Sequence, residues 1–154
     1  DAANRSRRGL RRRTGQVKIS VIAVGRIRDP FSDAEAHYLK MLRGRQDVEV
    51  VEVKDDEALA RRIDPAHHIV GLDLTGRQMD SEQWSRWLDT RRHAGQKVSM
   101  LIGGPNGLNA DARTRLDDTV SLGKQTLAHQ LARINLLEQL FRSSKILAGE
   151  PYHL

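Results

Sequence analysis

Adjacent glycines in the stretch LIGGPNGL, residues 101–108, mark a turn that could hold a ligand. Glycine lets the backbone approach a flat ligand closely, and Asn106-Gly107 is a strong turn signal. A phosphate is a poor candidate, because Pro105 has no N–H to donate and Asp111 adds a negative charge in the first turn of the next expected helix. The turn by itself leaves two interpretations open: a site for a ligand without phosphate, or a plain strand-to-helix connection.

The common motifs of phosphate and metal chemistry are missing from the sequence. The glycine turn lacks the G-x-G-x-x-G spacing, and Gly123-Lys124 lacks the flanking residues of a P-loop. No G-x-S-x-G surrounds Ser121, and the six histidines form no H-E-x-x-H. The chain has no cysteine, which excludes thiol catalysis and cysteine-ligated metals. We therefore expect no metal site.

Basic residues are concentrated at the start of the chain. The formal net charge is +6, and residues 1–15 supply most of it through six arginines and one aspartate. Residues 1–16 are expected to be a disordered extension or a remnant of expression, and the alternative is an arginine arm that grips RNA phosphates. Residues 17–154 are expected to form one domain, since this length supports a single core.

The composition also predicts where the protein works. The lack of cysteine suits a reducing compartment. No stretch of the sequence approaches the roughly 18 apolar residues that a membrane span requires. We therefore expect a cytoplasmic protein that does not enter a membrane.

The elements that must position the turn alternate between strands and helices. Apolar and β-branched runs predict strands at 17–25, 48–53, 69–74 and 97–102, with 119–127 as a strand or extended loop. Helices are expected after a Ser32/Glu35 capping box, before Pro65, after a cap at Asp80 or Ser81, after Asn109, and around Leu131, Ile134, Leu137 and Phe141. Thr75-Gly76 is expected to be a turn. This order predicts an α/β domain with a mostly parallel sheet, whose ligand lies at the carboxyl ends of the strands.

Five stretches, in one order, carry a specific pattern: AVG at 23–25, LDLTGRQMDSEQW at 72–84, LIGGPNGL at 101–108, SLGKQTLAHQLARINLLEQLFRS at 121–143 and PYHL at 151–154. Together they resemble the RlmH family of ribosomal RNA large subunit methyltransferases, which belongs to the SPOUT class. The resemblance implies a SPOUT-type α/β-knot: a homodimeric α/β domain with a C-terminal trefoil knot that binds S-adenosylmethionine. It also implies methyl transfer to N3 of pseudouridine 1915 in helix 69 of 23S rRNA.

The resemblance also assigns candidate site residues. Its cofactor contacts fall on Leu72, Gly103, Leu122, Gly123, Lys124, Gln125, Thr126 and Leu127. Its polar candidates near the target base are Arg142, Tyr152 and His153, whereas His129 fits a helix cap or the edge of the core better than catalysis. Leu154 replaces a basic residue common in the family, and Gly123 replaces a serine.

Two further expectations concern partners. The apolar stripe of the last helix suits a dimer seam. Residues 16–154 are nearly neutral, so we expect them to attract free RNA only weakly. This favours the assembled ribosome as the substrate, because its shape offers contacts that free RNA lacks. The competing interpretations are a Rossmann-like domain for an NAD-type dinucleotide and a ribosome-binding module without catalysis.

Overall fold

A computed structural model describes residues 17–152, so the expectations for residues 1–16, His153 and Leu154 lie outside the described part. Its centre is a five-stranded sheet in which every pair of neighbouring strands is parallel, in the order β2-β1-β4-β3-β5. The strands are β1 (Ile19–Val24), β2 (Val48–Val53), β3 (His68–Gln78), β4 (Val98–Ile102) and β5 (Asp118–Ser121). The expected α/β class with a parallel sheet is confirmed.

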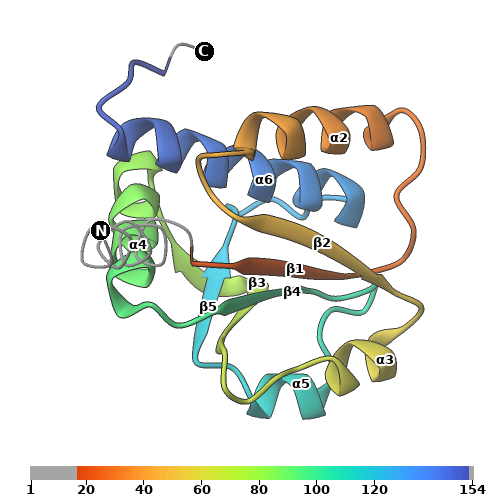
Figure 1. Ribbon diagram of the computed structural model, residues 1–154. Coiled ribbons are helices and arrows are strands. Elements are labelled where there is room, and N and C mark those ends of the chain that lie inside the picture. The colour runs from red at the N-terminus through yellow and green to blue at the C-terminus, as the bar shows by residue number, and fades with distance from the viewer. Residues whose placement is uncertain (1–16, 153–154) are drawn as a thin grey trace, which may run out of the picture.

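Helices cover both faces of the sheet, as Figure 1 shows. One face carries α2 (Phe31–Leu42), α4 (Ser81–Ala94) and α6 (His129–Leu147), and the other carries the short helices α3 (Asp56–Arg61) and α5 (Ala110–Thr114). This coverage explains why every residue of β4 is buried, since a central parallel strand is enclosed on both sides. None of the helices between residues 17 and 152 is long and apolar enough to cross a membrane.

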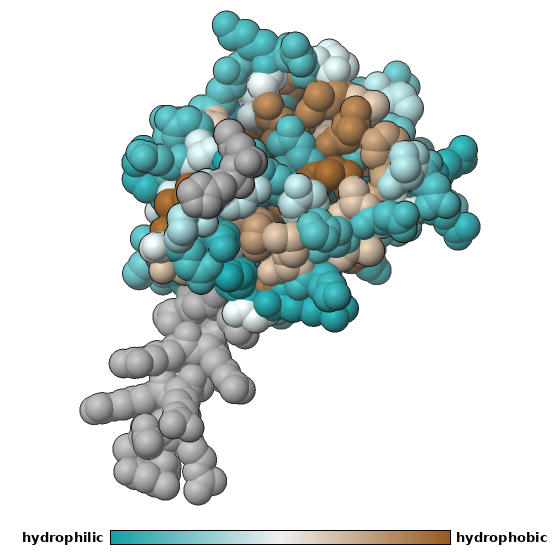
Figure 2. Space-filling view, turned by 90° about the horizontal axis from the view of Figure 1, so that it is seen from above, coloured by the Kyte–Doolittle hydropathy of each residue, from teal (hydrophilic) through white to brown (hydrophobic). Residues whose placement is uncertain are grey.

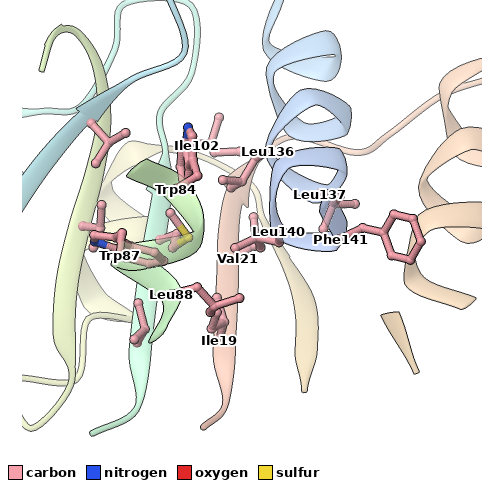
Figure 3. Close-up of a cluster of buried hydrophobic side chains, with 14 of the residues drawn as sticks. Ile19, Val21, Trp84, Trp87, Leu88, Ile102, Leu136, Leu137, Leu140 and Phe141 are labelled. Carbon is pink, nitrogen blue, oxygen red and sulfur yellow. The ribbon is translucent and has the colours of Figure 1, made fainter. Parts of the chain in front are cut away.

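The larger core lies between the sheet and α6 (Figure 3). Leu136, Leu137 and Leu140 of α6 are fully buried, and the cluster includes Trp84 and Leu88 of α4. Each buried leucine stabilises the fold by roughly 1.5–3 kcal/mol. These buried leucines anchor the middle of α6, and its first turn is thereby held in a fixed position beside the ends of the strands.

Local caps were predicted with mixed success. Asp80 accepts a hydrogen bond from the N–H of Gln83 at 2.8 Å in a full capping box, and Asn109 accepts one from the N–H of Ala112 at 2.9 Å. The Ser32/Glu35 capping box is wrong, because α2 begins one residue before Ser32, whose hydroxyl donates to Asp29 instead. Helix α3 ends at Arg61, four residues before Pro65.

The expected turn at Thr75-Gly76 is also wrong, because β3 continues to Gln78. β3 pairs with β5 both before and after a register shift between Leu72 and Arg77. A Cβ on Gly76 would lie 2.7 Å from the backbone of Val120. The glycine therefore permits a close crossing of two strands, a use of glycine that local sequence does not distinguish from a turn.

Candidate functional site

A cavity of about 250 Å³ opens where the register shift of β3 meets the loops that follow the carboxyl ends of β4 and β5. Its walls come from residues 72–74 of β3 and from the segments 102–107 and 121–127, and the first turn of α6 closes the remaining side. In parallel sheets this edge is the usual place for a ligand, because the connections to the following helices leave a crevice there. We call this cavity the cofactor pocket.

The structure brings most of the expected cofactor residues to this pocket. Its walls include Leu72, Gly103, Leu122, Gly123, Gln125, Thr126 and Leu127. Lys124 is the exception, since it is exposed and does not line the cavity. Segments that lie about 50 residues apart in the chain thus form one surface.

The glycine turn forms a tight wall of the pocket. The N–H of Gly107 donates to the carbonyl of Gly104 at 2.9 Å, and Gly107 has a positive φ of 75°. A Cβ on Gly103 would lie 2.5 Å from the carbonyl carbon of Gly107. Backbone therefore occupies the space that any side chain at Gly103 would need, and the pocket wall there consists of main chain.

Two charged residues in the pocket were not singled out from the sequence. Arg113 donates to Asp73 at 2.5 Å, and Asp73 also accepts the backbone N–H and the hydroxyl of Thr75, each at 3.0 Å. The Thr75 backbone N–H first, and then Arg113, hold the pKa of Asp73 below its ordinary value despite partial burial. Asp73 is therefore a carboxylate at neutral pH. The position of Asp73 directly after the buried run IVGL was the available signal.

A buried arginine fixes the first turn of α6 to the sheet. Arg133 is 1% exposed and forms ion pairs with Glu52 at 2.7 Å and Glu35 at 3.2 Å. It also donates to the carbonyl of Gly25 at 3.0 Å, just past the end of β1. These contacts join α6, α2, β2 and the β1 loop at the border of the pocket. Sequence reasoning missed Arg133, because nothing in its helical context distinguishes it from an exposed arginine.

His129 lines the pocket on the first turn of the same helix. The helix begins at His129 itself, and its N-cap is Ala128, which provides no side-chain hydrogen bond. The interpretation of His129 as a helix cap is therefore wrong. Its imidazole borders the cavity instead.

Arg142 and Tyr152 lie together at the other end of α6. Arg142 forms an ion pair with Glu138 and lies over the ring of Tyr152, 4.0 Å from the ring centre. The hydroxyl of Tyr152 donates to Glu138 at 2.9 Å. Hydrogen bonding to Glu138 raises the pKa of Arg142, and burial first and then Glu138 raise the pKa of Tyr152. Both therefore stay protonated at neutral pH.

This pair is separated from the cofactor pocket within one chain. The last pocket residue on α6 is Ala132, ten residues before Arg142. At 1.5 Å per residue, this corresponds to roughly 15 Å along the helix axis. Figure 1 shows α6 running away from the pocket end toward α4 and the C-terminus. His153, the third expected catalytic residue, lies outside the described residues.

The chain segment before Tyr152 is tied to the body by Glu150. Its carboxylate accepts hydrogen bonds from Arg45 at 2.8 Å and Lys145 at 3.0 Å, and these lower its pKa to about 2. Because this folded pKa is below the ordinary 4.5, the stabilisation is present above pH 4.5 and is lost as the pH falls through about 2.

We therefore expect Glu150→Gln to lower the melting temperature by roughly 2 °C at pH 7 and to have no effect near pH 2. Thermal unfolding followed by circular dichroism at a series of pH values checks this. Glu57→Gln, at an exposed position of α3, is the matched control. A Glu150→Gln difference that persists unchanged to pH 2 would contradict the assignment.

Among residues 17–152, no group of three or more histidine or acidic side chains could hold a metal ion. The cofactor pocket is correspondingly poor in charge, with Asp73, Arg113 and His129 as its ionisable side chains within the described chain. Such a pocket suits a ligand recognised through backbone groups and apolar contacts.

Comparison with known proteins identifies the family. A family model described as "Predicted SPOUT methyltransferase" matches residues 17–153. A protein from Carboxydothermus hydrogenoformans named Ribosomal RNA large subunit methyltransferase H is 33% identical over 158 aligned residues, which cover 89% of this chain and 99% of that protein. A protein of the same name from Bacillus cytotoxicus has the same identity and coverage.

A solved structure shares the fold. The crystal structure of a methylase family protein from Neisseria gonorrhoeae aligns with a TM-score of 0.53 and 13% identity, covering 92% of this chain and 87% of that chain. With the family match across the described domain and full-length relatives at this identity, the chain belongs to the RlmH family of SPOUT methyltransferases.

Proposed function

We propose that this protein methylates N3 of pseudouridine 1915 in helix 69 of 23S rRNA, with S-adenosylmethionine as the methyl donor. The observation that carries the proposal is the cofactor pocket, whose walls combine seven of the eight residues expected to contact that donor. Support for an rRNA substrate comes from the names of the relatives. When bound, S-adenosylmethionine supplies an electrophilic methyl group.

The pocket suits this cofactor chemically. A molecule without phosphate does not need the donor that Pro105 lacks, and the main-chain wall at Gly103 allows close approach to a flat adenine. Asp73 presents carboxylate oxygens that can accept hydrogen bonds from hydroxyl or ammonium groups. Gly123 and Gln125 add backbone groups from the third loop. A trefoil knot is part of the same proposal, and it rests on the resemblance to the family.

Arg142 and Tyr152 are proposed to meet the target nucleotide. Because both remain protonated at neutral pH, they act as hydrogen-bond donors rather than as bases. Donors directed at the base carbonyls would stabilise the negative charge that develops when N3 loses its proton. The ring of Tyr152 can also stack on an unpaired base, a common mode of RNA recognition. His153 is proposed to join them from the adjacent position.

A homodimer would explain how the cofactor pocket and the Arg142–Tyr152 pair can act on the same nucleotide. Within one chain Arg142 lies roughly 15 Å along the helix from the pocket residue Ala132, which is too far for contact with a methyl group. Leu131 on α6 is 44% exposed, and Figure 2, which looks onto the layer of α2 and α6, shows a patch of hydrophobic side chains there. We propose that a second copy covers this face and that one protomer's Arg142 and Tyr152 serve the pocket of its partner.

Calorimetry is the first test of the cofactor. Binding of S-adenosylmethionine, without binding of NAD, is the expected result. Binding of NAD instead would favour a Rossmann-like dinucleotide domain, and binding of neither would favour a module without catalysis. Sedimentation of wild type and Leu131→Glu tests the homodimer, since the charge should dissociate it.

Mass spectrometry of helix 69 is the test of the reaction. Ribosomes that lack the modification should gain one methyl group, of about 14 Da, on the pseudouridine after incubation with protein and cofactor. Naked 23S rRNA should react much more slowly. An unchanged mass would contradict the assigned reaction, and equal rates on ribosomes and naked rRNA would contradict the assembled substrate.

We expect Arg142→Gln to lower kcat about tenfold while leaving the affinity for S-adenosylmethionine unchanged. Losing one charged donor from the transition state costs about 1.4 kcal/mol, which corresponds to this factor. Methyl transfer to ribosomes and calorimetry with the cofactor measure the two quantities. Arg142→Lys, which retains the charge, should recover part of the rate. If Arg142→Gln lowers the affinity for S-adenosylmethionine as much as it lowers kcat, the residue acts by supporting the structure and not by contacting the nucleotide.

A further inference from the structure

A second cavity lies apart from the cofactor pocket and has no role in the function proposed above. It encloses about 460 Å³ between α4, β3 and the edge strand β5. No residue lines both cavities. Its walls include the first residues of β3 and β5 and also Arg77 and Gln78 at the end of β3, whereas the cofactor pocket is lined by residues 72–74 in the middle of that strand. We call it the α4 cavity.

Three arginines from two elements line the α4 cavity. Arg77 of β3 and Arg86 of α4 are at its exposed rim, with 56% and 68% of their side chains accessible, and Arg91 lies deeper. Arg77 is paired with Asp118 at 2.8 Å, whereas Arg86 approaches its only described carboxylate, Glu82, no closer than 4.0 Å. Within residues 17–152, no carboxylate lies within 4.0 Å of Arg91. Two guanidinium groups therefore remain available.

The acidic residues of the cavity are already engaged. Asp118 accepts from Arg77 and from the backbone N–H of Thr119, and Asp117 accepts the backbone N–H of Ile69 at 2.8 Å. Burial, and then Arg91, lower the pKa of His68, so its imidazole is neutral at pH 7. The remaining polar groups of the wall are mainly donors, which suits a ligand that brings acceptor oxygens.

Two buried N–H groups in the same wall have no acceptor. The indole Nε1 of Trp87 and the Nε of Arg91 form no hydrogen bond with any of the described residues. Trp87 is 7% exposed, and Figure 3 shows it at the margin of the core cluster, with its ring nitrogen directed away from Val21 and Leu140. Buried donors are almost always paired in proteins, and an unpaired one carries an uncompensated desolvation cost. We take these two unpaired N–H groups as a sign that a bound ligand supplies the missing acceptor oxygen.

We propose that the α4 cavity binds a backbone phosphate of the RNA substrate, as an anchor separate from the cofactor pocket. A phosphodiester offers acceptor oxygens and a negative charge to Arg86, Arg91 and the indole N–H. An RNA strand fits better than a free phosphate ion, because the cavity is open and its two available arginines, Arg86 and Arg91, lie more than one turn apart on α4, so neighbouring phosphates can be contacted together. Such contacts position the RNA and do not read its sequence. The inference rests on the proposed rRNA substrate.

The indole resonances give a direct test. The chain has two tryptophans, Trp84 and Trp87, so an ¹⁵N-correlation spectrum contains two indole N–H signals, and Trp87→Phe assigns them. Titration of the full chain with a helix 69 stem-loop RNA at low salt should shift the Trp87 signal. The Trp84 ring packs edge-on against Trp87, with 5.7 Å between the ring centres, so the Trp84 signal should shift less than the Trp87 signal. Inorganic phosphate should produce the same shift only at far higher concentration.

Charge removal tests the same site through the reaction. The double variant Arg86→Gln/Arg91→Gln should bind the stem-loop about tenfold more weakly and should raise KM for ribosomes, with kcat and cofactor affinity unchanged. Arg61→Gln is the matched control, since Arg61 is exposed on α3 at the opposite face of the sheet. The double variant should also have a smaller slope of log affinity against log salt.

The outcomes separate this inference from the proposed function. The inference is overturned if the Trp87 signal does not shift on addition of RNA, or if inorganic phosphate shifts that signal at concentrations as low as those of the RNA. It is also overturned if the double variant binds RNA as tightly as Arg61→Gln does. If wild type methylates no ribosome but the Trp87 signal and the double variant respond to RNA as expected, the proposed reaction fails and the RNA anchor stands.

Discussion

Replacing Gly103 with alanine should weaken binding of S-adenosylmethionine at least 100-fold, a loss of about 2.7 kcal/mol. The added Cβ would lie 2.5 Å from the carbonyl carbon of Gly107, 2.7 Å from its oxygen and 2.8 Å from the nitrogen of Leu108. These atoms belong to the backbone of the turn, so relief requires the turn to move. Overpacking of this kind typically costs 1–3 kcal/mol, and here the displaced main chain is itself the pocket wall.

Gly104→Ala is the matched control for this experiment. Its Cβ would approach the Val24 side chain at 3.3 Å and the Asp56 carboxylate at 3.6 Å, and side-chain ends of this kind can adjust. We expect cofactor affinity within about threefold of wild type for this variant. Calorimetry measures both affinities, and thermal unfolding shows whether each variant is folded. Wild-type affinity in a folded Gly103→Ala protein would remove the turn from the proposed cofactor site.

Replacing Arg133 with methionine should destabilise the fold by about 3 kcal/mol, the low end for a buried pair, because it leaves the largely buried Glu35 and the partly exposed Glu52 without their cation. Arg133 is the buried partner of both Glu35 and Glu52, and it also donates to the Gly25 carbonyl. Methionine retains the apolar stem and fills most of the volume, so the loss reports the charge and its hydrogen bonds rather than a cavity. Urea unfolding at pH 7.5 measures the free energy difference.

The pH dependence of this effect follows from Glu52. Burial alone would raise its pKa, but hydrogen bonds from Arg133 and from the backbone N–H of Ile27 hold it below the ordinary 4.5. A lowered folded pKa means that the stabilisation is present above pH 4.5 and is lost as the pH falls through the folded value. The difference between wild type and Arg133→Met should therefore shrink in acid.

Neutral partners provide the control for Arg133. In the triple variant Arg133→Met/Glu35→Gln/Glu52→Gln no buried charge lacks a partner, and we expect it to recover more than half of the lost stability at pH 7.5. Arg133→Lys retains one charge but not the several donors of the guanidinium, so it should be intermediate. If Arg133→Met is as stable as wild type at pH 7.5, the ion pairs do not support the fold.

The Arg133 cluster also connects stability with function. The N–H of Ile27 donates to Glu52 at 2.6 Å, and the N–H of Arg28 donates to Gln130 at 3.0 Å, so the loop after β1 is held to the first turn of α6. His129 and Ala132 of this turn line the cofactor pocket. Variants of Arg133 that remain folded should therefore also lose cofactor affinity, although Arg133 itself does not line the cavity.

Elements with a strong local signal were predicted well. β-branched runs correctly indicated β1 and β2. Asn109 was correctly identified as a cap, and so was Asp80 as one of two candidates with Ser81, since a cap depends on a side chain and an N–H three residues apart. The errors lie where a distant segment competes with the local signal. Thr75-Gly76 resembles a turn, yet β3 pairs with β5 on both sides of it, and the Ser32 hydroxyl donates to Asp29 instead of forming a capping box.

The candidate site residues show the same difference between local signals and contacts with distant segments. Family resemblance named residues in three separate stretches, and seven of these eight cofactor residues line one cavity that no local pattern could have indicated. It also named Arg142 and Tyr152 without showing that they lie at the far end of α6. Arg133 and the α4 cavity had no sequence signal, because burial of an arginine and of an indole N–H depends on neighbours far along the chain.

The sequence by itself therefore determined the order of strands and helices, the parallel α/β class and the family. Periodicity, caps and glycine spacing are interactions between near neighbours in the chain, and they can be recognised without a fold. Only the tertiary structure decided which loops share the cofactor pocket, how Arg133 holds α6 beside it, and that Arg142 is separated from it. These depend on burial and on contacts between residues up to about 100 positions apart, such as Arg133 with Gly25 and Glu35, which are established only when the sheet and α6 pack together.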